Sequence, residues 1–136
     1  MKRDTMCIQA GWEPGNGEPR VMPIYQSTTF KYSTSEEMGK LFDLEKEGYF
    51  YSRLQNPTCD LVAKKICDLE GGAAAMLTSS GQAATLLAVT NICSAGDHVI
   101  CAAKVYGGTS NLLAVTLKRF GIQVSLVDQD LPAEEI

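Results

Sequence analysis

After residue 55, the apolar positions of the chain alternate between helical spacing and strand-like spacing. Short apolar runs predict β-strands, and longer runs with apolar residues at i, i+3 and i+4 predict helices. The predicted strands cover residues 74–78, 98–102 and 123–127, and the helices between them cover residues 82–93 and 109–120. Strands and helices that alternate in this way form parallel sheets through right-handed crossovers, so the sequence predicts an α/β fold with a βαβαβ segment.

A further helix is predicted before the first of these strands. Val62, Ile66 and Leu69 recur at i, i+4 and i+7, which gives the helix an apolar stripe. Asn56 is a good N-cap before Pro57, and two glycines at 71–72 predict the end of the helix. In the last predicted helix of the chain, the apolar stripe consists of Leu113, Leu117 and Phe120.

The first part of the chain has little sustained periodicity and is rich in Gly, Pro, Ser and Thr. We therefore expect an extended arm, interrupted by one short helix near residues 35–46 that Ser35 opens. An arm without a core of its own normally lies on another surface, often that of a neighbouring subunit. The predicted organisation is an arm and dimer-contact segment over residues 1–55, and the first part of an incomplete α/β domain over residues 56–136.

Composition and charge restrict the class of protein. The chain has 136 residues, of which 45% are hydrophobic and 21% charged, as in a soluble globular domain. Its net charge of −4 predicts no basic surface, so we expect small-molecule ligands and no binding to nucleic acid or membranes. No segment is typical of a signal peptide or a membrane span, so we expect a cytoplasmic protein.

The cysteine and histidine content argues against a metal centre. The five cysteines are an odd number without a C-x-x-C pair, which predicts reduced thiols in structural positions. His98 is the only histidine, so a Cys/His zinc site or a Ser-His-Asp triad is hard to build from this chain. We expect no metal site.

A turn rich in hydroxyl groups follows the first predicted strand. Thr78, Ser79 and Ser80 supply hydroxyl donors, and Gly81 allows a ligand to approach the backbone closely. The helix that follows adds about half a positive charge at its N-terminus, so the turn suits a phosphate group. The alternative is an ordinary turn in which a serine is the N-cap.

Two other segments carry side chains that suit a phosphorylated aromatic ligand. Arg53 can bind a phosphate through two hydrogen bonds, and Tyr51 points the same way if the segment is extended. Tyr106 follows a predicted strand and precedes two glycines, so its ring has room to stack on a flat ligand. The alternatives are a surface arginine packed on Tyr51 and a buried core tyrosine at position 106.

Taken together and in order, these motifs resemble the pyridoxal-phosphate enzymes of cysteine and methionine metabolism. The resemblance extends over essentially the whole chain and implies part of the large domain of a fold-type I enzyme. The motifs that carry it are Pro23-Ile24-Tyr25-Gln26-Ser27-Thr28-Thr29-Phe30, Tyr51-Ser52-Arg53, Asn56-Pro57-Thr58, Glu70-Gly71-Gly72, Ser80-Gly81-Gln82-Ala83-Ala84, Gly96-Asp97 and Tyr106-Gly107-Gly108-Thr109.

This resemblance implies roles for particular residues. The cofactor, pyridoxal 5'-phosphate, is expected to receive hydrogen bonds from the backbone at Gly81 and Gln82, while Tyr106 stacks on its ring. Tyr51 and Arg53 are expected to reach the phosphate of a neighbouring subunit, in a homo-oligomer that is a dimer of dimers. The expected cofactor-binding residues are Tyr51, Arg53, Ser80, Gly81, Gln82 and Tyr106.

The chain also departs from the family pattern. Pyridoxal-phosphate chemistry needs a Schiff-base lysine, which the family carries in a Ser/Thr-x-Thr-Lys setting. None of the eight lysines of this chain has that setting, so we expect no catalytic residue here and no activity from these residues alone.

Gln82 after the glycine of the phosphate turn looks most like the O-acetylhomoserine sulfhydrylases. The implied reaction of the whole protein is γ-replacement on O-acetylhomoserine by sulfide or a thiol, which gives homocysteine or a relative. A methionine γ-lyase or a cystathionine γ-synthase is the alternative within the family. A non-catalytic nucleotide-binding α/β module is the alternative outside it, although no G-x-G-x-x-G or G-x-x-x-x-G-K-[ST] motif follows a predicted strand.

Overall fold

The computed structural model describes residues 1–135 and divides the chain into two compact units. The first unit ends at Leu77 and the second begins at Thr78. No helix in the described part of the chain is both long enough and apolar enough to cross a membrane.

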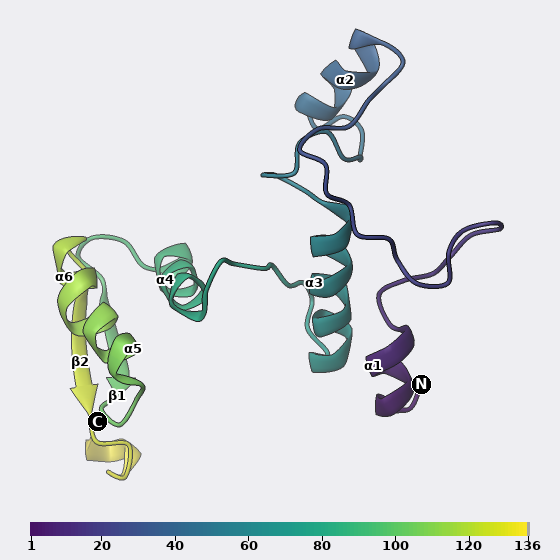
Figure 1. Ribbon diagram of the computed structural model, residues 1–136. Helices are drawn as coiled ribbons and strands as arrows, with labels where there is room; N and C mark the ends of the chain where they lie inside the picture. The colour runs from purple at the N-terminus through teal and green to yellow at the C-terminus, as the bar shows by residue number, and fades with distance from the viewer. Residues whose placement is uncertain (136) are drawn as a thin grey trace. The chain divides into compact units, whose positions relative to one another are not determined.

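The first unit contains three helices: α1 (Arg3–Gln9), α2 (Ser35–Phe42) and α3 (Pro57–Glu70). Helix α1 lies beside α3 (Figure 1). The ammonium group of Lys65 on α3 donates hydrogen bonds to the carbonyl oxygens of Cys7 and Ile8, at 3.3 and 3.2 Å. These bonds satisfy carbonyls at the C-terminal end of α1, where a positive charge is favourable. The prediction of an arm without a helix before residue 35 is therefore wrong.

Helix α3 begins and ends where the sequence predicts. The side chain of Asn56 accepts a hydrogen bond from the backbone N–H of Thr58, and Gly71 ends the helix in the left-handed conformation with φ 67°. The predicted apolar stripe is only partly buried, because Val62 and Ile66 are 40% and 45% exposed. The buried residues of α3 are Pro57 and Ala63. Within the described residues of this unit, no element covers the whole predicted stripe.

Helix α2 is shorter than predicted, and its N-cap is the residue before Ser35. Thr34, not Ser35, is the N-cap, and its hydroxyl oxygen accepts from the N–H of Glu37 at 3.2 Å. The helix ends at Phe42 because Leu44 adopts a positive φ of 58°, which takes the backbone out of the helical region. The short apolar and charged stretch after residue 42 therefore forms a turn.

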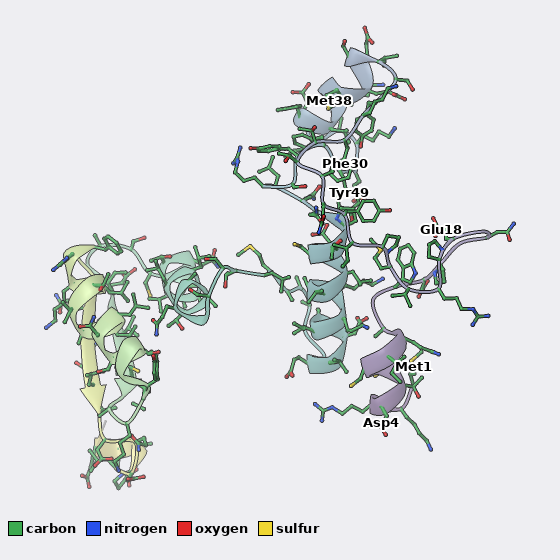
Figure 2. All side chains as sticks on the ribbon, viewed as in Figure 1. Met1, Asp4, Glu18, Phe30, Met38 and Tyr49 are labelled. Atoms are coloured by element: carbon green, nitrogen blue, oxygen red, sulfur yellow. The ribbon has the colours of Figure 1, made fainter. Side chains whose placement is uncertain are left out.

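An aromatic cluster joins two parts of the arm. The ring centroid of Phe30 lies 5.9 Å from that of Tyr49 and 6.5 Å from that of Tyr25. Figure 2 shows Phe30 and Tyr49 beside the N-terminal end of α3. Burial, followed by the negative charge and hydrogen bond of Asp60 on α3, raises the pKa of Tyr49. The cluster thus connects the arm to α3.

Replacing Tyr49 by phenylalanine should reduce the loss of stability at alkaline pH. Because the folded-state pKa of Tyr49 lies above its ordinary value of 10.0, the proton-linked stabilisation is complete below that value and is lost as the pH rises through the folded-state pKa. We expect the free energy of unfolding of the wild type to fall more steeply than that of Tyr49→Phe as the pH rises above 10.0. Urea unfolding at fixed pH values measures both slopes, and equal slopes would contradict this assignment.

The second unit is built around two parallel strands, β1 (His98–Ala102) and β2 (Gln123–Val127). The register pairs His98 with Gln123 and Ala102 with Val127. Both strands have the bounds that the sequence predicts. One continuous helical stretch connects them, made of α5 (Gly107–Asn111), a π-helical turn η1 (Leu112–Thr116) and α6 (Leu117–Arg119). Figure 1 shows this stretch lying against the pair of strands, as expected for a βαβ unit.

The core of the second unit lies between the connecting helix and the strands. Leu113, Leu117 and Ile122 are buried, at 3%, 0% and 2% exposure. Val99 and Val124 on the strands pack against them, as does α4 (Gly81–Ile92). The predicted burial of Leu113 and Leu117 is confirmed. Phe120 is 52% exposed, so its predicted burial is wrong.

The strand predicted over residues 74–78 does not form. Met76 is 71% exposed and Leu77 is 41% exposed, and no described residue pairs with this segment in a ladder. A strand needs a hydrogen-bonded neighbour, and an apolar run alone does not supply one. The described sheet therefore has two strands. Of the predicted βαβαβ segment, only the second βαβ unit, from β1 to β2, is formed within the described residues. The last element of the described residues is a short 3₁₀ helix, η2 (Ala133–Glu135).

Candidate functional site

The N-terminus of α4 presents free hydrogen-bond donors. Ser80 is the N-cap, and its hydroxyl oxygen accepts from the N–H of Ala83 at 3.1 Å. The N–H of Ala84 bonds to the carbonyl of Ser80 at 3.0 Å. Within residues 1–135, no hydrogen bond uses the N–H groups of Gly81 and Gln82. Because α4 also carries positive potential at this end, these two donors suit an anion.

Gly81 leaves open space beside these donors. A Cβ atom added at this position would meet no atom within 4 Å, and the residue does not have a positive φ. Neither packing within the described residues nor backbone conformation therefore requires a glycine here. Glycine is less favourable than alanine in a helix, and the difference is about 0.5–1 kcal/mol in the middle of a helix. Gly81 therefore does not stabilise α4. Close approach of a ligand to the backbone would explain a glycine at this position.

The loop after β1 places the side chain of Tyr106 near that of Gln82, on either side of Gly108. A Cβ atom added at Gly108 would lie 2.6 Å from Cε1 of Tyr106 and 2.7 Å from Nε2 of Gln82. The Gln82 amide also donates to the hydroxyl of Thr109 at 3.5 Å. Tyr106 is 77% exposed, so the alternative of a buried core tyrosine is wrong. An exposed ring thus lies beside the residue that carries one of the free N–H groups, at the carboxyl end of a parallel strand, where α/β sheets bind ligands.

Tyr51 and Arg53 meet in the first unit. The guanidinium carbon of Arg53 lies 5.1 Å from the centroid of the Tyr51 ring, in a cation–π contact. The prediction that this segment is extended is wrong, because the N–H groups of Leu54 and Gln55 both donate to the carbonyl of Tyr51 and form a turn. The turn, not strand alternation, brings the two side chains together. Arg53 remains exposed, so its guanidinium donors are accessible to a ligand.

Sequence reasoning missed the acidic partners of Lys104. The Lys104 ammonium lies 3.5 Å from a carboxylate oxygen of Asp128 and forms a further ion pair with Asp130. The two aspartates follow β2. Two acidic residues after a predicted strand could have indicated a partner for Lys104, which follows the neighbouring strand β1. These side chains are exposed, and such ion pairs contribute about 0–1 kcal/mol.

Residues 4–135 match the model of a known family, the Cys/Met metabolism PLP-dependent enzymes. The chain belongs to this family. Pyridoxal 5'-phosphate is the cofactor of its members, and the expectation about the cofactor is confirmed at that level.

Individual relatives agree with the family match. The homocysteine/cysteine synthase of Kluyveromyces lactis is 44% identical over 133 residues, which are 96% of this chain and 30% of the relative. The O-acetyl-L-homoserine sulfhydrylase of Leptospira meyeri is 41% identical over 132 residues, with the same coverage. The chain thus spans about 30% of the length of these relatives.

A solved structure shares the fold. The crystal structure of a putative O-acetylhomoserine (thiol)-lyase from Campylobacter jejuni superposes with a TM-score of 0.88 at 34% identity. The match covers 96% of this chain and 31% of that one, which contains a pyridoxyl-lysine-5'-monophosphate. The predicted fold class, part of a fold-type I large domain, is confirmed.

The residues described above fit the two ends of this cofactor. The free N–H groups at the start of α4 and the open space beside Gly81 suit its phosphate group. The exposed Tyr106 ring suits its flat pyridine ring. The roles of the six predicted cofactor-binding residues remain predictions.

Proposed function

We propose that this chain forms the N-terminal part of a pyridoxal-phosphate-dependent O-acetylhomoserine sulfhydrylase. The whole protein would replace the acetate of O-acetylhomoserine with sulfide, or with a thiol, to release acetate and homocysteine or a relative. The observation that carries the proposal is the identity of 41–44%, over nearly all of this chain, to relatives with sulfhydrylase or homocysteine synthase names. Gln82, in the phosphate turn, is the residue of this chain that favours the same subgroup.

The proposed roles of the residues follow from their donors and surfaces. The N–H groups of Gly81 and Gln82 hold the phosphate at the helix N-terminus, and the hydroxyl proton of Ser80 adds a donor because its oxygen already serves the N-cap. Tyr106 holds the ring by stacking. When bound, the cofactor supplies the electron sink that permits proton removal next to the substrate amino group.

Tyr51 and Arg53 are proposed to bind the phosphate of a neighbouring subunit. The guanidinium group offers two parallel N–H donors to a phosphate, and the phenol of Tyr51 offers another. An arm over residues 1–55 that reaches a second subunit requires a homo-oligomer, for which we propose a homotetramer in the cytoplasm. Residues 56–136 are then the first part of the cofactor-binding domain.

The experiment that tests the proposal is an assay of the purified full-length protein. With pyridoxal 5'-phosphate, O-acetylhomoserine and sulfide, it should release acetate and form homocysteine in equal amounts. Release of α-ketobutyrate from methionine would indicate a γ-lyase instead, and joining of cysteine to an activated homoserine would indicate a cystathionine γ-synthase.

Residues 1–136 by themselves are proposed to be inactive. No lysine of this chain stands in the family's Schiff-base setting, so the separate polypeptide should show no visible absorbance from lysine-bound cofactor. A yellow, lysine-linked species formed by this polypeptide would refute that part of the proposal.

A further inference from the structure

Asn56 is the only polar side chain that is buried within residues 1–135, with 8% exposure. Its side-chain oxygen accepts from the N–H of Thr58 at 2.9 Å, which caps α3. Its side-chain nitrogen donates to the carbonyl of Tyr25 at 3.1 Å and to the hydroxyl oxygen of Ser52 at 3.0 Å. The whole amide is therefore engaged, and a buried polar group of this kind is costly to leave without a partner.

Capping alone does not account for these contacts. An N-cap needs only an oxygen acceptor, and aspartate or serine supplies it as well as asparagine does. The two donor bonds of Asn56 are additional, and they run to residues 4 and 31 positions earlier in the chain. The amide nitrogen therefore connects the start of α3 to the arm.

Ser52 is the residue through which this connection reaches the proposed phosphate ligands. It stands between Tyr51 and Arg53 in the sequence. Its backbone N–H donates to the carbonyl of Thr28 at 2.8 Å, and its hydroxyl group donates to the carbonyl of Ser27. Together with the bond from Asn56, three hydrogen bonds hold Ser52 in place.

We propose that Asn56 is a positioning residue that, acting through Ser52, holds Tyr51 and Arg53 in the arrangement that binds the cofactor's phosphate. This inference rests on the proposed function, because it assumes that the two side chains bind that phosphate. Arg53 is exposed and has a long, flexible side chain. Fixing the backbone that carries it reduces the conformational entropy lost when the phosphate binds. The two side chains also stay in contact, with the guanidinium over the Tyr51 ring.

Two variants separate positioning from helix capping. Asn56→Asp keeps an oxygen that can accept from Thr58 but cannot donate to Ser52 or Tyr25. Ser52→Ala leaves the α3 cap of Asn56 and its bond to the Tyr25 carbonyl in place, and removes the hydroxyl group that accepts from Asn56 and donates to Ser27. Ser52→Ala adds no charge. It therefore shows whether an effect of Asn56→Asp comes from the lost hydrogen bonds or from the new carboxylate.

The readout compares pyridoxal 5'-phosphate with pyridoxal, which lacks the phosphate group. Dissociation constants for both are measured on the full-length apoenzyme by absorbance titration. Each variant removes two hydrogen bonds around Ser52 and Asn56, but these bonds act on the phosphate only through the backbone that carries Arg53. Both variants should therefore lose affinity for pyridoxal 5'-phosphate by about two- to tenfold, and should bind pyridoxal nearly as the wild type does. A purely structural role would weaken both ligands alike or lower only the melting temperature.

Thr34→Ala is the matched control, because it removes the N-cap of α2 in the same unit. It should lower the melting temperature without changing the preference for the phosphorylated ligand. If Arg53→Ala lowers that preference while Asn56→Asp and Ser52→Ala leave it unchanged, the inference is overturned and the proposed function stands. If Arg53→Ala leaves the preference unchanged, the assignment of the phosphate to Arg53 is itself wrong, and the inference is overturned with it.

Discussion

Replacing Arg53 with alanine in the full-length enzyme weakens the binding of pyridoxal 5'-phosphate by about 10- to 150-fold. The expected size follows from the loss of a charge-assisted hydrogen bond to the phosphate, which contributes about 1.5–3 kcal/mol. Arg53 is exposed, and within residues 1–135 its guanidinium group makes a cation–π contact with Tyr51 and no ion pair, so its removal should cost the fold little. Absorbance titration of the apoenzyme measures the affinity, and thermal unfolding of the apoenzyme measures the fold.

The matched variants for this prediction are Arg53→Lys and Arg20→Ala. Lysine keeps the charge but cannot form two parallel hydrogen bonds, so it should recover only part of the affinity. Arg20 is another exposed arginine of the same unit, and its loss should leave the affinity unchanged. If the Arg20 and Arg53 alanine variants weaken binding equally, the effect belongs to net charge and not to a phosphate contact.

Gly108→Ala is expected to lower the affinity for pyridoxal 5'-phosphate by about tenfold while the fold remains intact. The new Cβ atom would overlap Cε1 of Tyr106 and Nε2 of Gln82, at 2.6 and 2.7 Å. Both atoms belong to side chains that can move, and Tyr106 is 77% exposed, so the overlap is relieved by displacing the ring and the amide. Displacing the ring removes offset stacking of up to about 1.5 kcal/mol from the bound cofactor.

Gly107→Ala provides the control in the same turn of α5. A Cβ atom at Gly107 meets nothing within 4 Å, so neither Tyr106 nor Gln82 has to move. This variant should bind the cofactor nearly as the wild type does, and both variants should keep the wild-type melting temperature or exceed it, because alanine favours a helix. Equal affinities of the two variants would show that the position of the Tyr106 ring does not matter for binding.

Much of the fold was predictable where a local signal determines it. The Asn56 cap and the glycine at position 71 set the bounds of α3, and the bounds of β1 and β2 follow from short apolar runs. The strand expected over residues 74–78 did not form, because its apolar run has no neighbour to pair with in the described sheet. Helix α1 was missed because its stabilisation comes from Lys65, more than fifty residues away in the sequence.

The same distinction applies to the candidate site. The phosphate turn was predictable, because Ser80 is the N-cap of α4 and Gly81 is its first residue. The side chains of Gln82 and Tyr106 both approach Gly108, and this depends on how α4 packs against α5, for which the sequence carries no pattern. Likewise, the bond from Asn56 to Tyr25 joins residues 31 positions apart, so only the folded chain reveals it. Local chemistry could be predicted, whereas its supporting contacts could not.

The central claim is that the α4 turn, the Tyr106 ring and the Tyr51–Arg53 pair act on one phosphorylated pyridine. The most direct measurement is a crystal structure of the full-length oligomer with pyridoxal 5'-phosphate. We predict that the N–H groups of Gly81 and Gln82, and the guanidinium group of Arg53 from a neighbouring subunit, lie about 3 Å from oxygens of the same phosphate, with Tyr106 stacked on the ring. A phosphate held without Arg53, or a Tyr106 ring on a surface away from the cofactor, would contradict the claim.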